Sequence, residues 1–207
     1  MNPSFLKLLL PFLIACNSQE KPIDGKVKID SGYAKTSDER RVIAADSNNI
    51  SDATIDTTIN GNIVLWNPQS VITVLGDLSG KMQELPTEGA FVIFKNRDGN
   101  KYLKMVHLPG SDPNTFRFFE VGYTEGVDKG IQLLSSSIED FKTESGVRLG
   151  IALSDFEKGS IKKYTKKVKG DGTEFVFSET IDGLRYSAFY FFKGLKLVKF
   201  GFGYDNP

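Results

Sequence analysis

The sequence predicts an α+β fold of two tandem units, each with a short helix packed on an antiparallel β-meander. Sixteen phenylalanines and an aromatic content of 12% favour sheets over helix bundles. Glycine-containing dipeptides separate runs of strand-forming residues, as tight hairpins require. The order of strand, helix and three strands is predicted twice along the chain, and this repeat sets the fold class.

The predicted organisation has four parts. Residues 1–15 have the pattern of a signal peptide, and residues 16–55 that of a modified cysteine followed by a flexible polar tether. The first α+β unit is expected over residues 56–130 and the second over residues 131–207. An apolar content of 40% is ample for a packed core in these units.

The first unit opens with a strand-like run over residues 61–66. Asn67 suits the N-cap of a helix and Pro68 suits its first position. A short helix is therefore predicted through Leu75, and Gly76 can end it. Three strands are expected to follow it, at residues 91–95, 102–108 and 116–123.

The second unit opens with the strand-like run 146–150. Ser154 and Glu157 have the spacing of a capping box, which predicts that a helix starts there. Its apolar face is expected to carry Phe156, Ile161 and Tyr164. Three strands are predicted after it, at residues 174–180, 184–192 and 195–204.

Two dipeptides set the predicted register of the last three strands. Asp182-Gly183 and Lys193-Gly194 are expected to form two-residue hairpin turns, because glycine adopts positive φ without strain. Between the two units, residues 130–141 are compatible with either a strand or a short helix.

The N-terminal residues carry the clearest signal for location. A basic residue, Lys7, precedes a short apolar run over residues 8–15, as in a secretory signal peptide. The run is too short to span a membrane, which needs about 20 apolar residues. Leu13-Ile14-Ala15-Cys16 resembles the lipobox of bacterial lipoproteins. The resemblance implies cleavage before Cys16 and attachment of a lipid such as palmitate to its sulfur.

The residue after the cysteine bears on the destination. It is Asn17 rather than aspartate, and resemblance to the enterobacterial sorting rule implies delivery to the outer membrane. An ordinary signal peptide that carries a chance cysteine is the alternative interpretation.

Tandem units of this kind behind a lipobox resemble the β-lactamase-inhibitory-protein-like (BLIP-like) fold, which small outer-membrane-assembly lipoproteins share loosely. The stretch from Phe141 to Gly150, which leads into the predicted capped helix, is the part most similar to that family. The resemblance implies protein binding without a common catalytic site. No inhibitory residue carries over, because no motif in the chain matches one.

Several functional classes are disfavoured by composition. Basic and acidic residues balance at 26 each, so nucleic acid is not an expected partner. Cys16 is the only cysteine, and its acylation would leave no thiol for a disulfide, a zinc site or a nucleophile. His107 is the only histidine, and its position on an apolar strand favours a structural role. We therefore expect no catalytic residue, metal site or cofactor.

Lysines cluster in the second unit, at positions 158, 162, 163, 166, 167 and 169. Such runs usually keep an exposed face soluble. Contact with a membrane beside the lipid anchor is the alternative, since each lysine near an anionic surface contributes about 1 kcal/mol.

The function predicted from these features is that of a membrane-anchored envelope lipoprotein that acts as a protein-binding or scaffold module. Its partners would be the membrane, through the lipid on Cys16, and another envelope protein. The alternative function is an enzyme that acts on envelope polymers through acidic residues.

The binding surface is expected on the open face of the last three strands. The predicted register places Leu195, Gly201 and Gly203 on the core face, with the neighbouring aromatic residues on the opposite face. The predicted partner-binding residues are Arg185, Phe189, Phe191, Lys196, Phe200, Phe202 and Tyr204. The alternative is that the first unit or the N-terminal segment covers these aromatic residues.

Overall fold

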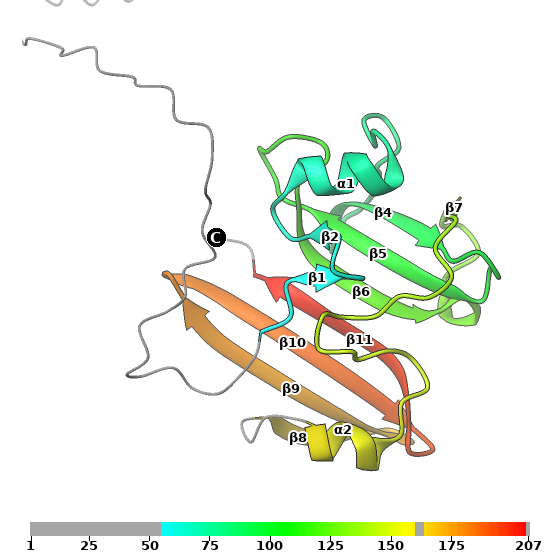
Figure 1. The fold of residues 1–207 in the computed structure, drawn as a ribbon, viewed down its shortest axis with the longest axis vertical. Helices are drawn as coiled ribbons and strands as arrows, with labels where there is room; N and C mark the ends of the chain where they lie inside the picture. The colour runs from blue at the N-terminus through cyan, green and yellow to red at the C-terminus, as the bar shows by residue number, and fades with distance from the viewer. Residues whose placement is uncertain (1–54, 160–163, 206–207) are drawn as a thin grey trace, which may run out of the picture. The chain divides into compact units, whose positions relative to one another are not determined.

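The structure is a computed structural model that describes residues 55–159 and 164–205. Within these ranges it contains two α-helices and eleven strands, nine of which form one sheet (Figure 1). The strand order in this sheet is β3-β4-β5-β6-β11-β10-β9-β8, and β7 pairs with β4. The prediction of two tandem α+β units is therefore wrong, because a single, mainly antiparallel sheet runs through both of them.

The first half of the chain supplies one side of this sheet. Its elements are β1 (Thr58–Ile59), β2 (Ile63–Val64), α1 (Pro68–Leu75), β3 (Gln83–Leu85), β4 (Gly89–Lys95), β5 (Lys101–His107), β6 (Phe116–Tyr123), the 3₁₀ turn η1 (Thr124–Gly126) and β7 (Leu134–Ser135). The three strands predicted after the helix are confirmed as β4, β5 and β6. The run predicted at 61–66 shortens to β2, which pairs only with β1.

Helix α1 forms as its sequence predicts. Asn67 caps it, since its Oδ1 accepts a hydrogen bond from the Ser70 N–H at 3.1 Å. Gly76 ends it with φ of +78°, and its N–H donates to the Ile72 carbonyl at 3.0 Å. Val71 points into the core and is fully buried. Local capping chemistry is therefore enough to fix this element.

The second half supplies the other side of the sheet. Its elements are α2 (Leu153–Gly159), β8 (Thr165–Lys169), β9 (Gly172–Ile181), β10 (Leu184–Lys193) and β11 (Lys196–Tyr204). The last three strands are confirmed as β9, β10 and β11, with ends that differ by one or two residues. The segment 130–141, which the sequence left open, contains the short strand β7.

The start of the second half differs from its prediction. The run 146–150 is a loop with one isolated bridge between Lys142 and Arg148. Helix α2 begins before Ser154, and the Ala152 carbonyl accepts from the Phe156 N–H at 3.0 Å, so the capping-box prediction is wrong. Tyr164 lies outside the helix, and Ile161 lies outside the described residues.

The two halves join where β11 pairs with β6. Phe200 lies opposite Val121 and Phe202 opposite Phe119 across this seam, and β11 pairs with β10 on its other side. Most of the apolar core packs on one face of the sheet, under α1, the β1–β2 hairpin and α2. A smaller cluster on the other face includes Phe91 and Tyr102, with Val127 and Ile131 of the loop after β6 packed against it.

One hairpin turn differs from its prediction by one residue. Ile181 pairs with Leu184 around Asp182-Gly183, as predicted. In the next hairpin Lys193 pairs with Lys196, so the turn residues are Gly194 and Leu195 rather than Lys193 and Gly194. Leu195 is consequently exposed in the turn, and its predicted place on the core face is wrong.

A β-bulge then reverses the faces of β11. Phe192 pairs with Leu197 but Phe191 pairs with Lys199, which leaves Val198 without a partner in the register. A slip of one residue moves every following side chain to the other face. As a result Phe200, Phe202 and Tyr204 lie on the core face, and Gly201 and Gly203 lie on the open face.

Candidate functional site

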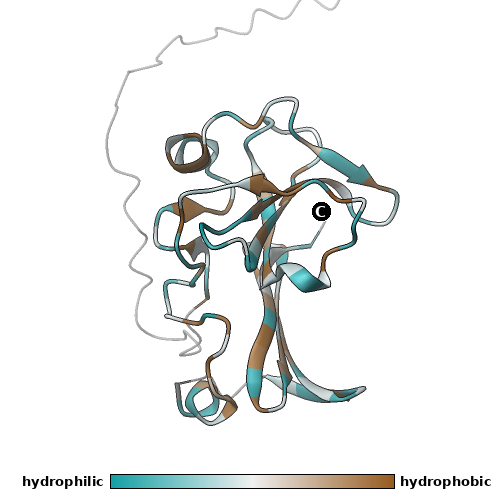
Figure 2. Ribbon diagram, turned by 90° about the vertical axis from the view of Figure 1, so that its right-hand side faces the viewer, coloured by the Kyte–Doolittle hydropathy of each residue, from teal (hydrophilic) through white to brown (hydrophobic). Residues whose placement is uncertain are grey.

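The open face of the sheet spans the seam between the two halves. Neighbouring positions on β6, β11 and β10 form two cross-strand rows, Phe118-Gly203-Ser187 and Glu120-Gly201-Phe189. Figure 2 shows α2 and the connecting loops on one side of the sheet half that contains β8 to β11, and no described helix on the other side. The side chains of Phe118, Glu120, Ser187 and Phe189 are part-exposed, so these rows form part of the surface.

Glycines make room for flat aromatic rings on this face. A Cβ atom at Gly201 would lie 2.6 Å from the Phe189 ring and 3.0 Å from the Phe118 ring. These two rings stack with centroids 6.3 Å apart and planes inclined by 15°. On β9, a Cβ atom at Gly172 would lie 2.5 Å from the Phe191 ring. The three phenylalanines lie on glycine backbone and keep their other faces part-exposed.

Charged side chains alternate with these rings. Glu120 accepts a hydrogen bond from the Tyr102 hydroxyl at 2.7 Å and pairs with Lys199 at 3.0 Å. The Lys199 ammonium also lies 5.9 Å from the centroid of the Phe189 ring. The open face thus combines a strip of aromatic rings with fixed charges of both signs.

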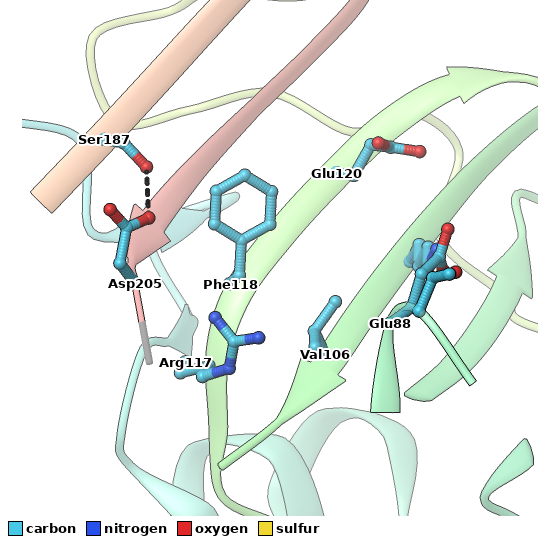
Figure 3. A pocket seen from close by; sticks show the side chains of 9 residues that line it. Glu88, Val106, Arg117, Phe118, Glu120, Ser187 and Asp205 are labelled. Atoms are coloured by element: carbon cyan, nitrogen blue, oxygen red, sulfur yellow. Dashed lines mark hydrogen bonds and ion pairs between the residues drawn. The ribbon is translucent and has the colours of Figure 1, made fainter. Parts of the chain in front are cut away.

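A cavity of about 370 Å³ lies beside the aromatic strip (Figure 3). Figure 3 places Arg117 and Phe118 next to each other on β6, with Asp205 and Ser187 on the far side of Phe118 from Val106. The residues that line the cavity are Thr87, Glu88, Lys104, Val106, Arg117, Phe118, Glu120, Ser187 and Asp205.

Arg117 is the cavity residue with the most unused hydrogen-bonding capacity. Its Nη1 donates to the Tyr204 carbonyl at 3.0 Å, whereas its buried Nε has no partner among the described residues. Burial lowers the pKa of Arg117, and the nearby Asp205 carboxylate opposes that shift. Within residues 55–159 and 164–205, Arg117 forms no ion pair. The Nη2 of Arg117 also has no hydrogen-bond partner among the described residues and is not buried, so it could donate to a carboxylate brought by a ligand.

The carboxylates around the cavity are already engaged by neighbours. Glu88 pairs with Lys104, and Glu120 pairs with Lys199. Asp205 accepts from the Ser187 hydroxyl at 3.1 Å and pairs with Arg185 at 3.2 Å. Within the described ranges there is also no group of three His, Cys, Asp or Glu side chains placed to hold a metal ion.

The predicted partner-binding residues divide into two groups. Arg185, Phe189 and Phe191 lie on the open face, and Lys196 is exposed at the start of β11. Phe200 and Phe202 have no exposed surface, so their predicted place on a binding surface is wrong. The bulge in β11 is the physical reason.

Tyr204 and Cys16 are the remaining predicted site residues. Tyr204 is half-buried on the core side, where its ring lies 4.7 Å from that of Trp66, so its predicted place on the open face is wrong. Cys16 lies outside the described residues.

The residues that the prediction missed come from the first half of the chain. Alternation along β6 predicts that Arg117 and Phe118 have different surroundings, but only the pairing of β6 with β11 brings Phe118 beside Phe189. His107, the only histidine, has its Nε2 3.1 Å from the Asp112 carbonyl oxygen and lies beside Phe116. These contacts belong to the turn that precedes β6.

A buried carboxylate lies below the opposite face of the sheet. Asp56 is 4% exposed and accepts hydrogen bonds from the Ser145 N–H and hydroxyl at 3.1 and 3.0 Å. The Tyr190 hydroxyl lies 3.4 Å from its Oδ2, and the Tyr186 hydroxyl donates to its carbonyl at 2.8 Å. Burial raises the pKa of Asp56 although the bonds from Ser145 oppose the shift, and nearby Glu144 raises it further. The cluster fastens residue 56 to β10 and to the loop before α2.

Comparisons with known proteins give no identification. No family model matches the chain, and neither the curated proteins nor the solved structures contain a match to it. The assignment of a candidate site therefore rests on the structure alone. The protein is a β-sheet protein, and its candidate site is a part-exposed aromatic strip beside a cavity.

Proposed function

We propose that this chain is a lipid-anchored lipoprotein of a bacterial cell envelope, delivered to the outer membrane as its sorting residue implies, and that its open sheet face binds another envelope protein. The anchor rests on the lipobox resemblance at Cys16. Among the described residues no helix is long and apolar enough to cross a membrane.

The observation that carries the binding proposal is the strip formed by Phe118, Phe189 and Phe191. Aromatic rings in a part-exposed patch with a charged rim are typical of protein-binding surfaces, and aromatic and arginine side chains are their usual hot spots. The neighbouring cavity offers the Arg117 guanidinium. The partner segment that suits this surface would carry an apolar side chain next to a carboxylate.

Binding is favoured over hydrolysis of an envelope polymer for a physical reason. A glycoside hydrolase needs a pair of carboxyl groups across a cleft that are available as acid and base. Each carboxylate at the cavity is instead held by a lysine, arginine or serine side chain.

Crosslinking from the open face tests the proposal. A photoreactive amino acid in place of Phe191 should capture one discrete envelope protein in the native organism. The same amino acid in place of Asp98, an exposed residue in the β4–β5 turn, is the matched control and should not capture it. Equal capture from both positions, or none from Phe191, would contradict the proposal.

The anchor is tested separately. Cys16→Ser should move the protein from the membrane fraction to the soluble fraction without a change in its melting temperature. Retention of the unmodified variant in the membrane fraction would show that Cys16 does not carry the anchor.

A further inference from the structure

One end of the sheet exposes two large apolar side chains. The β8–β9 and β10–β11 turns lie together there, at the lower right of Figure 1. The register aligns Lys169, Gly172, Lys193 and Lys196 in one row across these four strands. We call this end the lysine tip, which comprises Lys167, Val168, Lys169, Lys193, Leu195 and Lys196.

Val168 and Leu195 are the most exposed large apolar residues of the described chain. Their exposed fractions are 83% and 69%, and the next in this class is Trp66 at 38%. Single exposed apolar side chains are common on protein surfaces. Val168 lies on the edge strand β8 and Leu195 in the β10–β11 turn, so two apolar side chains project into solvent at the same end of the sheet.

Leu195 is also held in an unfavourable backbone conformation. Gly194 and Leu195 have φ of +54° and +64°, the conformation of a turn in which glycine and asparagine are the usual residues. A bulky side chain in the left-handed region is an outlier. The turn thus combines backbone strain with a leucine exposed to solvent, and such strain is often found at functional positions.

Lysines flank both apolar side chains along the chain. The Lys169 ammonium pairs with the Glu174 carboxylate at 3.4 Å, and the Lys193 ammonium pairs with the Asp171 carboxylate at 2.6 Å. Lys167 and Lys196 form no ion pair with the described residues, so the tip and these two acidic partners carry an excess of positive charge. Lysines on an edge strand also prevent its pairing with another strand. That role explains Lys167 and Lys169 but not the exposed Leu195.

We propose that the lysine tip contacts an anionic lipid bilayer, with Leu195 and Val168 inserted at the level of the headgroups and the lysines on lipid phosphates. Apolar side chains flanked by lysines bind such surfaces by burying apolar area and by electrostatic attraction. This contact goes beyond the proposed function, because it needs neither the acyl chain on Cys16 nor a protein partner.

Vesicle binding of the unacylated chain tests the proposal. The full chain with Cys16→Ser is mixed with vesicles of phosphatidylcholine alone or of phosphatidylcholine with phosphatidylglycerol, and the bound fraction is measured by sedimentation. We expect binding to the anionic vesicles and loss of that binding at high salt. Absence of binding to anionic vesicles would overturn the proposal.

A substitution in the strained turn separates membrane contact from a structural role. In the same Cys16→Ser chain, Leu195→Asn should lower the partition coefficient on anionic vesicles about tenfold, because about two buried methylene groups are lost. Its melting temperature should stay the same or rise, since asparagine tolerates positive φ. Unchanged vesicle binding by this variant would overturn the proposal.

A matched control lies at the other end of β10. Leu184 is a half-buried apolar residue next to the Asp182-Gly183 turn. Leu184→Asn should leave vesicle binding unchanged, and an equal loss in both variants would contradict a contact localised at the lysine tip. The result says nothing about the anchor, because every chain in this experiment lacks the acylated cysteine.

Discussion

Asp56 is the one acidic residue that is buried within residues 55–159 and 164–205. Its carboxylate loses hydration, and bonds from Ser145 recover only part of that free energy, so its pKa is raised above 3.8. The folded state therefore binds this proton more tightly than the unfolded state does. Stability from Asp56 is fully present below the unfolded pKa and is lost as the pH rises through the folded pKa.

This linkage makes a prediction about the difference between the wild-type protein and Asp56→Asn. The asparagine does not titrate, so other groups contribute equally to both proteins and cancel. We expect the unfolding free energy of the wild-type protein to rise relative to that of Asp56→Asn as the pH falls from 7 towards 4. Urea unfolding at several pH values measures this difference. A constant difference, or one of opposite sign, would show that the Asp56 pKa is not raised.

Phe200 and Phe191 are aromatic residues on opposite faces of neighbouring strands. Phe200→Ala should cost about 3–5 kcal/mol of unfolding free energy, because it leaves a cavity in the core. Phe191→Ala should cost about 1 kcal/mol, since that ring is part-exposed. Chemical denaturation of the two variants gives both values. Similar costs would mean that the two faces of β10 and β11 are assigned incorrectly.

At the scale of elements, α1 owes its start to one side chain. Asn67→Ala removes the bond from the Ser70 N–H and should lower the unfolding free energy by about 1 kcal/mol. Gln69→Ala, at an exposed position in the first turn, is the control and should change it little. Thermal unfolding of both variants checks this prediction, and equal melting temperatures would count against the capping role.

Elements with local signals could be predicted from the sequence, and elements without them could not. The N-cap, first-turn proline and terminal glycine of α1 act within a few residues, and so does the Asp182-Gly183 turn. At 193–195 two overlapping dipeptides compete for the turn. In the structure Gly194-Leu195 forms the turn, which places Leu195 at positive φ. No local preference favours a leucine in that conformation.

The candidate site was only half predictable for the same reason. The open-face positions of Phe189 and Phe191 could be predicted from the alternation of side chains along β10, because β10 pairs with β9 in a regular register. The bulge at Val198 has no local sequence signal, yet it moves Phe200 and Phe202 into the core. The pairing of β6 with β11 joins segments about eighty residues apart, and turn chemistry carries no information about such a contact.

At the scale of the whole molecule, the shared sheet predicts cooperative unfolding. Trp66 belongs to the first half, but its ring contacts Tyr204 at the end of β11. We expect tryptophan fluorescence and far-ultraviolet circular dichroism to report one transition with the same midpoint in urea. Two separated transitions would instead indicate halves that unfold independently.

Gly203 lies at the seam where β11 pairs with β6 and the two halves of the sheet join. Its φ is +149°, and a Cβ atom there would meet the Arg117 carbonyl and the Phe118 backbone on β6. Gly203→Ala should cost at least about 1–3 kcal/mol of unfolding free energy, because both the backbone and β6 must shift. Gly126→Ala is the control, since a Cβ atom there meets nothing within 4 Å. Equal melting temperatures of the two variants would contradict this account of the seam.

The central place of β11 also governs when the chain can fold. Strands β3 to β6 emerge from the ribosome long before β11, which must still insert between β6 and β10. Until then β6 has an unpaired edge and the first-half core lacks Phe200 and Phe202. Contacts between residues so far apart in sequence form slowly. We therefore expect a nascent chain of this topology to complete its sheet only after β11 has been synthesised, so that synthesis of the last strand sets the earliest time of folding.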